Sequence, residues 1–161
     1  MTTLARFDAF DAVVARACDL LQPPVLLGIR LWVSWQFLAS GWLKLTTWDT
    51  TVELFRSEYR VPLLAPELAA VAGTFGELVF PVLLVAGLFT RIGALGLFTV
   101  NAVALASYWH VLGADGFEAA RGQHYFWGLM LIVLIAFGGG RWSLEALRGG
   151  REPRANNVGE H

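Results

Sequence analysis

Four long apolar runs constrain the fold of this chain more than any other feature of its sequence. A helix needs about 20 residues to cross the hydrocarbon core of a bilayer. The runs occupy residues 21–43, 68–90, 92–114 and 122–140, and the only Asp, Glu, Lys or Arg residues inside them are Arg30 and Glu77. We therefore predict an all-α integral membrane protein, a four-helix bundle that forms a single domain over residues 1–148.

The composition supports a membrane location and excludes some other classes of protein. Charged residues make up 16% of the chain and hydrophobic residues 56%, whereas a soluble domain carries about 25% charged residues. The 12 basic and 13 acidic residues nearly balance, so there is no basic excess with which to bind nucleic acid. Cys18 is the single cysteine, which excludes an internal disulfide and a CxxC motif.

The lysines and arginines outside the apolar runs predict the orientation of the chain. Seven lie in the N-terminal segment, the second connection and the C-terminal tail, and four lie in the first and third connections. Cytoplasmic segments of membrane proteins are enriched in these residues. We therefore expect both termini on the cytoplasmic side.

The segments around the runs also carry readable patterns. Apolar residues at helical spacing before the first run indicate an amphipathic helix at the membrane surface, or alternatively an extension of the first span; they are Leu4, Phe7, Phe10, Val14, Ala17 and Leu21. Residues 48–65 mix apolar and charged residues, and Pro62 and Pro66 mark the end of this segment. This pattern predicts a short interfacial helix followed by an extended segment that leads back to the second span. Residues 149–161 are rich in Gly, Arg, Asn and Pro and are predicted to be a disordered tail.

The charged residues within the runs define a candidate site. An ionisable group in a span costs at least about 2.5–3.5 kcal/mol on insertion scales, and it is expected to be paired or functional. At 1.5 Å per residue, Arg30 and Asn101 lie about 13 Å from the cytoplasmic end of their spans, and Glu77 lies about 20 Å from that end. We predict an ion pair between Arg30 and Glu77 with Asn101 nearby, and we place Ser34 and Lys44 on the helix face of Arg30. Whether this cluster is a structural strut or a working site stays open.

Two histidines, one near the end of the third run and one near the start of the fourth, are predicted on the same side of the membrane and form a second candidate group. His110 and His124 lie at about the depth of Lys44, where they could bind copper or zinc, or carry protons. The alternative is that water satisfies both of them at the interface. They lack His-x-x-x-His or Glu-x-x-His spacing, so we assign no metal site to them.

Several short motifs along the chain resemble the DoxX family. They are Arg30-Leu31, Gly41-Trp42-Leu43-Lys44-Leu45, Glu77 followed by Gly87-Leu88-Phe89-Thr90-Arg91, and Gly140-Arg141-Trp142-Ser143-Leu144-Glu145. Two further segments, residues 48–51 and 58–64, together with residues 76–89, are most similar to the HvfX branch of that family. The chain has Gly138-Gly139-Gly140 where that branch usually has Gly-Pro-Gly.

The resemblance implies a multi-pass protein of the bacterial inner membrane. HvfX proteins are encoded beside the maturation enzymes of ribosomally made copper-binding peptides, which implies an auxiliary role in peptide maturation or export. Other DoxX proteins are associated with quinone-linked sulfur oxidation, which implies the alternative of a membrane subunit of an oxidoreductase. The sequence does not identify a cofactor; quinone and copper are the two candidates that the resemblance implies. The expected partners are the lipid bilayer, peptide-maturation or other membrane proteins, and a second copy of the chain.

A third hypothesis, a small-molecule transporter, is less favoured. The four runs show no internal repeat, and four spans enclose only a narrow path unless the chain oligomerises. The sequence does not decide whether the protein is an enzyme. It also contains no GxGxxG, Walker or GxSxG motif, so nucleotide cofactors and serine hydrolysis have no support.

Overall fold

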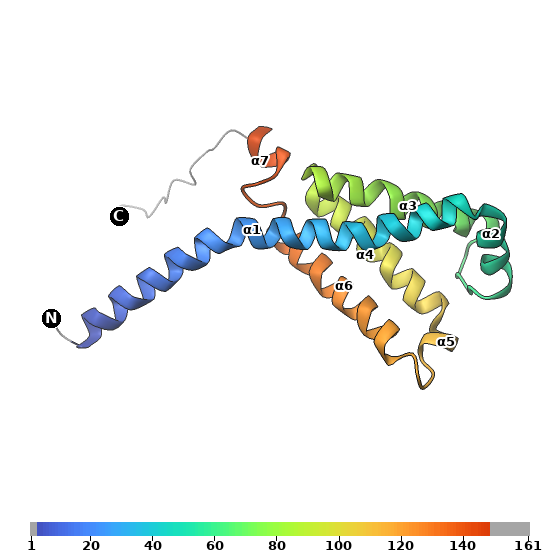
Figure 1. Ribbon diagram of the computed structural model, residues 1–161, viewed down its shortest axis with the longest axis horizontal. Helices are drawn as coiled ribbons and strands as arrows, with labels where there is room; N and C mark the ends of the chain where they lie inside the picture. The colour runs from blue at the N-terminus through green and yellow to red at the C-terminus, as the bar shows by residue number, and fades with distance from the viewer. Residues whose placement is uncertain (1–2, 149–161) are drawn as a thin grey trace, which may run out of the picture.

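The computed structural model describes residues 3–148 of the chain, and these residues form helices joined by turns and loops, without a strand. The predicted disordered tail at residues 149–161 lies outside the described residues. The helices are α1 (Thr3–Thr46), α2 (Trp48–Ser57), α3 (Pro66–Ala86), α4 (Thr90–Ser107), α5 (Trp109–Leu112), α6 (Glu118–Phe137) and α7 (Leu144–Arg148) (Figure 1). The prediction of an all-α protein is therefore confirmed.

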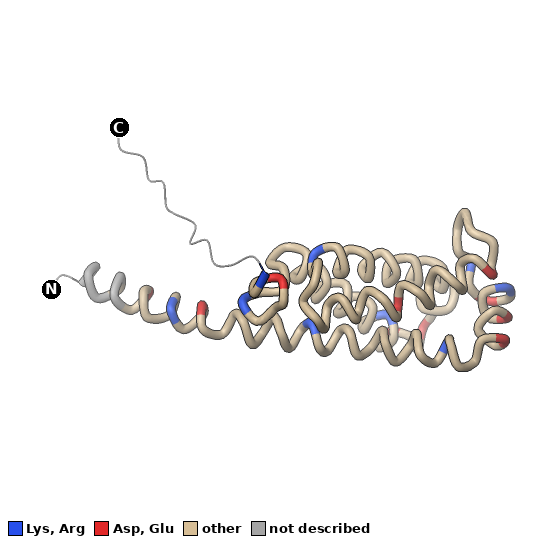
Figure 2. Tube along the Cα trace, turned by 90° about the horizontal axis from the view of Figure 1, so that it is seen from above, with Lys and Arg blue, Asp and Glu red and all other residues tan. Residues whose placement is uncertain are grey.

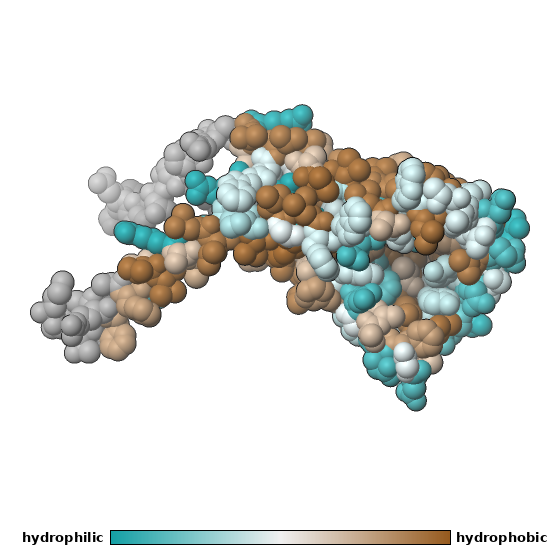
Figure 3. All heavy atoms as spheres, viewed as in Figure 1, coloured by the Kyte–Doolittle hydropathy of each residue, from teal (hydrophilic) through white to brown (hydrophobic). Residues whose placement is uncertain are grey.

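Among residues 3–148, three helices are long and apolar enough to cross a membrane. They are α3, α4 and the part of α1 from Phe10 to Thr46. Large apolar side chains cover the outward faces of these helices, as in Trp35, Phe75 and Ile92, and Figure 3 shows apolar surface along much of the visible face. The charged residues lie mainly towards the two ends of the packed helices (Figure 2). A water-soluble monomer rarely exposes apolar surface on this scale, so the chain is a helical membrane protein.

The sequence left two alternatives for the N-terminal segment, a separate amphipathic helix or an extension of the first span. In the structure the segment and the first apolar run form one continuous helix, α1. It runs for 44 residues through Pro23 and Pro24, and its N-terminal half extends away from the other helices (Figure 1). At 1.5 Å per residue this helix is about 66 Å long. The two prolines remove hydrogen-bond donors, but the helix continues through them. The N-terminal segment is therefore an extension of the first apolar run.

The third and fourth apolar runs end differently from their predicted bounds. The helix α4 stops at Ser107, since Tyr108 (φ −109°, ψ 17°) leaves the helical conformation, and the short α5 follows. The predicted span at residues 92–114 is therefore interrupted. The helix α6 ends at Phe137 because Gly138 has a φ of 73° and a ψ of −161°, a non-helical conformation whose positive φ favours glycine.

The packing order of the helices places the candidate residues. In the bundle, α3 packs against α1 and α4, and α6 packs against α4 and α1. Their main core is formed by Leu26, Val33, Phe37, Leu84, Ala94, Leu97, Leu131 and Leu134. A second cluster of Phe55, Ala69 and Ala70 fixes α2 against α3. The interfacial helix predicted after the first run corresponds to α2, and a loop over residues 58–65 leads to α3.

Candidate functional site

The ion pair between Lys44 and Glu77 is the centre of the candidate site. The Lys44 Nζ atom, in the last turn of α1, lies 2.5 Å and 2.6 Å from the Glu77 carboxylate oxygens and 3.2 Å from Ser40 Oγ. The exposed fractions of the Lys44 and Glu77 side chains are 20% and 6%. At Gly41, a Cβ atom would lie 3.0 Å from Glu77 Cβ, so the absence of a side chain there allows α1 and α3 to approach closely.

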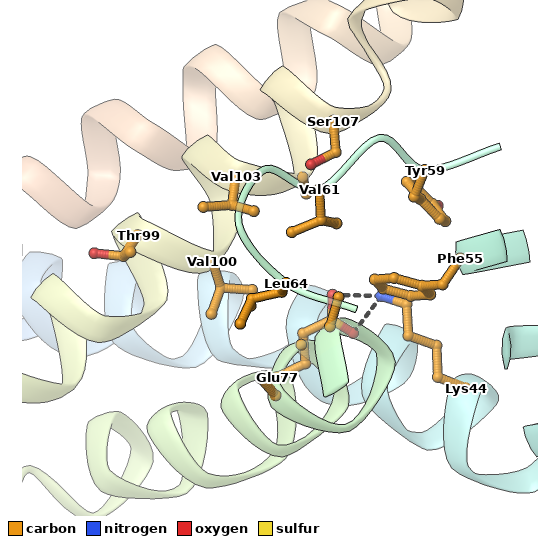
Figure 4. A pocket seen from close by; sticks show the side chains of 14 residues that line it. Lys44, Phe55, Tyr59, Val61, Leu64, Glu77, Thr99, Val100, Val103 and Ser107 are labelled. Atoms are coloured by element: carbon orange, nitrogen blue, oxygen red, sulfur yellow. Dashed lines mark hydrogen bonds and ion pairs between the residues drawn. The ribbon is translucent and has the colours of Figure 1, made fainter. Parts of the chain in front are cut away.

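Two cavities adjoin this ion pair. The first, here called the apolar cavity, has a volume of about 180 Å³ and lies among α3, α4 and the 58–65 loop (Figure 4). The second, here called the polar cavity, has a volume of about 290 Å³ and is lined by Gln36, Phe37, Ser40, Lys44, Tyr59, Glu77, Ala104, Tyr108, Leu112, His124 and Trp127. Four residues line both cavities: Lys44, Tyr59, Glu77 and Ala104. The ion pair is therefore accessible to a molecule in either one.

The buried Arg30 side chain does not take part in this site. Its guanidinium donates to the carbonyls of Leu84 (2.6 Å) and Val85 (2.8 Å), and to those of Gly139 (3.0 Å) and Trp142 (2.9 Å). The last carbonyls of a helix lack intrahelical partners and carry partial negative charge, so a cation there is favourable. Arg30 is 1% exposed and joins the C-terminus of α3 to the turn after α6, which makes it a structural strut.

The predicted ion pair between Arg30 and Glu77 is thus wrong. The prediction compared the depths of Arg30 and Glu77, about 13 Å and about 20 Å, and took the difference to be within reach of the arginine side chain. It did not account for the direction in which a long cationic side chain extends. Arg30 reaches the backbone at one end, and Lys44 reaches back to Glu77 from the other.

The segment around α7 completes the Arg30 end of the molecule. The Glu145 backbone N–H donates to the Gly87 carbonyl at 2.9 Å. The Glu145 carboxylate accepts from the Thr90 backbone N–H at 3.3 Å, which satisfies a free donor at the N-terminus of α4. The motif residues Gly87, Thr90 and Glu145 therefore hold the hairpin of α3 and α4 in place.

The other predicted residues differ in their hydrogen-bond partners. Asn101 Nδ2 donates to the His124 carbonyl at 2.9 Å, and Asn101 Oδ1 lies 2.9 Å from His124 Nδ1, so Asn101 orients a histidine that lines the polar cavity. Ser34 is buried and has no hydrogen-bond partner among residues 3–148. His110 Nε2 lies 4.0 Å from Glu58 Oε2. Within the part of the chain that the structure describes, no three His, Cys, Asp or Glu residues are grouped as metal ligands.

Two residues of the site escaped the sequence analysis. Tyr59 lines both cavities, and burial raises the pKa of its phenol, with smaller contributions from Tyr108 and Glu77. Ser107 is 2% exposed and lines the apolar cavity; its carbonyl accepts from the Arg60 backbone N–H at 3.0 Å and so anchors the 58–65 loop. The signals for Tyr59 were its place between the short helix and Pro62 and its presence in the segment 58–64 that resembles the HvfX branch. Nothing in the sequence distinguishes Ser107.

The fold and the site define a helical membrane protein with a buried ion pair between two cavities. The family model of DoxX matches residues 25–110, more than half of the chain, so the chain belongs to the DoxX family. It is also 29% identical over 130 residues to an uncharacterized protein of Haemophilus influenzae, covering 76% of this chain and 82% of that protein. No solved structure matches the chain.

Proposed function

We propose that this chain is a component of a bacterial inner membrane in which α1, α3, α4 and α6 cross the bilayer as a four-helix bundle. The helix α6 contains most of the apolar run at residues 122–140 and packs against α4 and α1, which supports a fourth crossing. The distribution of Lys and Arg supports cytoplasmic termini. A reporter fused to the C-terminus tests this topology: activity of a cytoplasmic reporter is expected, and a periplasmic signal would contradict it.

We further propose that the site binds a small membrane-soluble molecule, and the position of the Lys44–Glu77 pair beside both cavities carries this proposal. Ionisable residues within a membrane protein commonly mark functional sites because their burial is costly. An uncharged head group with two oxygens can accept one hydrogen bond from the Tyr59 hydroxyl and another from the Lys44 ammonium, which would exchange its bond to Ser40 for the bond to the ligand. A quinone ring has this chemistry, and a cavity of about 150 Å³ already admits a benzene-sized group. The chain would then act as a membrane subunit of a quinone-linked oxidoreductase.

The content of the purified protein tests this function. Protein purified in mild detergent is expected to contain a quinone, identified by mass spectrometry of its organic extract, and Glu77→Gln is expected to lose it. Glu67→Gln is the matched control, because Glu67 lies on the same helix in an exposed ion pair with Arg56. Absence of quinone from the wild-type protein, or equal retention by Glu77→Gln, would contradict the proposal.

A second candidate is an auxiliary role in the maturation or export of a copper-binding peptide, as in the HvfX branch. The segment 58–64, one of those similar to that branch, contributes Tyr59, Val61 and Leu64 to the apolar cavity. In this role the protein would act with peptide-maturation proteins or with a second copy of itself. Deletion of the gene is expected to leave the cognate peptide unmodified or unexported; unchanged modification and export would exclude this role.

A further inference from the structure

The apolar cavity meets the outer surface of the helices between α3 and α4. Three of its lining residues on α3 and α4, Ala72, Thr99 and Val103, are at the same time exposed at the surface. Around them the surface is apolar, with Val71 and Phe75 on α3 and Leu95 on α4. In a helical membrane protein such a surface faces lipid tails rather than water. The opening of the cavity therefore lies where a molecule dissolved in the bilayer can reach it.

The opposite walls of the apolar cavity carry different polar groups. Figure 4 shows the Lys44–Glu77 pair on one side and Ser107 on the other, with the aliphatic side chains of Val61 and Val100 between them. Ser107 Oγ is buried, and it has no hydrogen-bond partner among the described residues. A hydroxyl buried without a partner is unfavourable. The Ser107 hydroxyl has almost no exposed surface of its own in this rotamer, although the residue lines the cavity. A rotation about χ1 would turn the hydroxyl towards the cavity, where a ligand oxygen would supply the missing bond.

We propose that the apolar cavity takes an uncharged, ring-sized molecule with a hydroxyl group and an alkyl tail, which enters from the lipid between α3 and α4 and hydrogen-bonds to Ser107. This inference rests on the proposed function, namely that the site binds a membrane-soluble molecule, and adds the entry route and a residue that selects the ligand. The ring fits the volume of about 180 Å³, and the tail extends past Thr99 and Val103 into the bilayer. The uncharged hydroxyl avoids the cost of bringing a further charge beside Lys44 and Glu77.

The ligand chemistry can be tested with two probes that differ by one hydroxyl. Native mass spectrometry of the full chain in detergent measures the binding of 4-dodecylphenol and of dodecylbenzene. The phenol is expected to bind more tightly, and Ser107→Ala is expected to weaken its binding about fivefold, the value of a typical hydrogen bond, while leaving dodecylbenzene unchanged. Equal binding of the two probes, no binding of either, or unchanged phenol binding by Ser107→Ala would overturn the proposal.

The serine on α1 provides the matched control for this substitution. Ser34 is also buried without a hydrogen-bond partner in the described part of the chain, but it is not among the residues that line the apolar cavity. Both Ser107→Ala and Ser34→Ala are expected to raise the thermal midpoint of the ligand-free protein, because each removes an unsatisfied hydroxyl. Only Ser107→Ala should also weaken phenol binding. A loss of binding in both variants would mean that Ser107 acts through general stability and would contradict its role in selection.

The entry route has its own variant and control. Val103→Trp places a large side chain at the opening and is expected to slow uptake of 4-dodecylphenol from phosphatidylcholine vesicles at least tenfold. Leu95 is exposed about two helical turns away on the same face of α4 and does not line the cavity. The Leu95→Trp variant should therefore take up 4-dodecylphenol at the rate of the wild type. Equal rates in the two variants would exclude this route. The extraction of quinone from the purified protein separates this route from the proposed function. If the wild type contains quinone and Glu77→Gln does not, the proposed function stands even where the route fails. If Glu77→Gln retains the quinone, the proposed function itself fails.

Discussion

The Lys44 ammonium and the Glu77 carboxylate, 33 residues apart in sequence, form a buried ion pair that joins the end of α1 to the middle of α3. Burial of the pair has a desolvation cost, which the close contact and the bond to Ser40 offset. The pair thus contributes both to how α1 and α3 fit together and to the chemistry of the two cavities.

Removing one partner of this pair should cost more than removing both. Lys44→Met and Glu77→Leu each leave an uncompensated buried charge, with an expected loss of about 3–5 kcal/mol in the free energy of unfolding. The double variant should lose less than either single variant, as measured by unfolding in detergent. The exposed Arg56–Glu67 pair is the control cycle, with an expected coupling of about 0–1 kcal/mol. Additive losses at Lys44 and Glu77 would contradict a direct interaction.

Arg30 should not be replaceable by lysine. Its planar guanidinium bonds to four carbonyls on two segments, and a lysine ammonium has three donors and cannot span them. We expect Arg30→Lys to lower the free energy of unfolding by about 2–4 kcal/mol, as carbonyls lose their partners. The exposed Arg91 provides the control, because Arg91→Lys should change it by less than about 0.5 kcal/mol. Similar effects of the two substitutions would argue against the strut.

The sequence predicted the helices and the burial of their charged residues better than it predicted the hydrogen-bond partners of those residues. Long apolar runs specify helices because a helix satisfies its backbone hydrogen bonds within a single segment in lipid. The two charged residues within these runs, Arg30 and Glu77, are indeed buried. The partner of Arg30 is a set of backbone carbonyls, which no residue type in the sequence reveals. The break at Tyr108 was equally hidden, since neither glycine nor proline marks it. Both depend on how the helices pack, which is a tertiary property.

Two glycines should respond to alanine in opposite directions. Gly87 has a φ of 68°, and a Cβ there would lie 2.5 Å from Arg30 Nη2 and 2.8 Å from Ser143 Cα. Gly87→Ala should therefore lower the free energy of unfolding by at least about 2 kcal/mol, from left-handed strain together with the clash. Gly28 lies in α1 with open space around its Cβ position, so Gly28→Ala should raise it by about 0.5–1 kcal/mol through helix propensity. Tolerance of Gly87→Ala would mean that the turn after α3 is not fixed as described.

The titration of Tyr59 should reveal its buried position between the cavities. Burial first, then Tyr108 and Glu77, raise the pKa of its phenol above its ordinary value, because each of them disfavours the phenolate. Absorbance of phenolate at high pH in detergent should therefore include a late step that Tyr59→Phe removes.

The same shift predicts how stability depends on pH. The unfolded chain releases the Tyr59 proton at a lower pH than the folded chain, so the unfolded state binds fewer protons between the two pKa values. The stabilisation is complete below the unfolded pKa of about 10 and is lost as the pH rises through the folded pKa. The free energy of unfolding of the wild type should therefore fall over this interval more steeply than that of Tyr59→Phe. Parallel curves for the two proteins would show that Tyr59 titrates as an exposed tyrosine, and would place it outside the walls of the cavities.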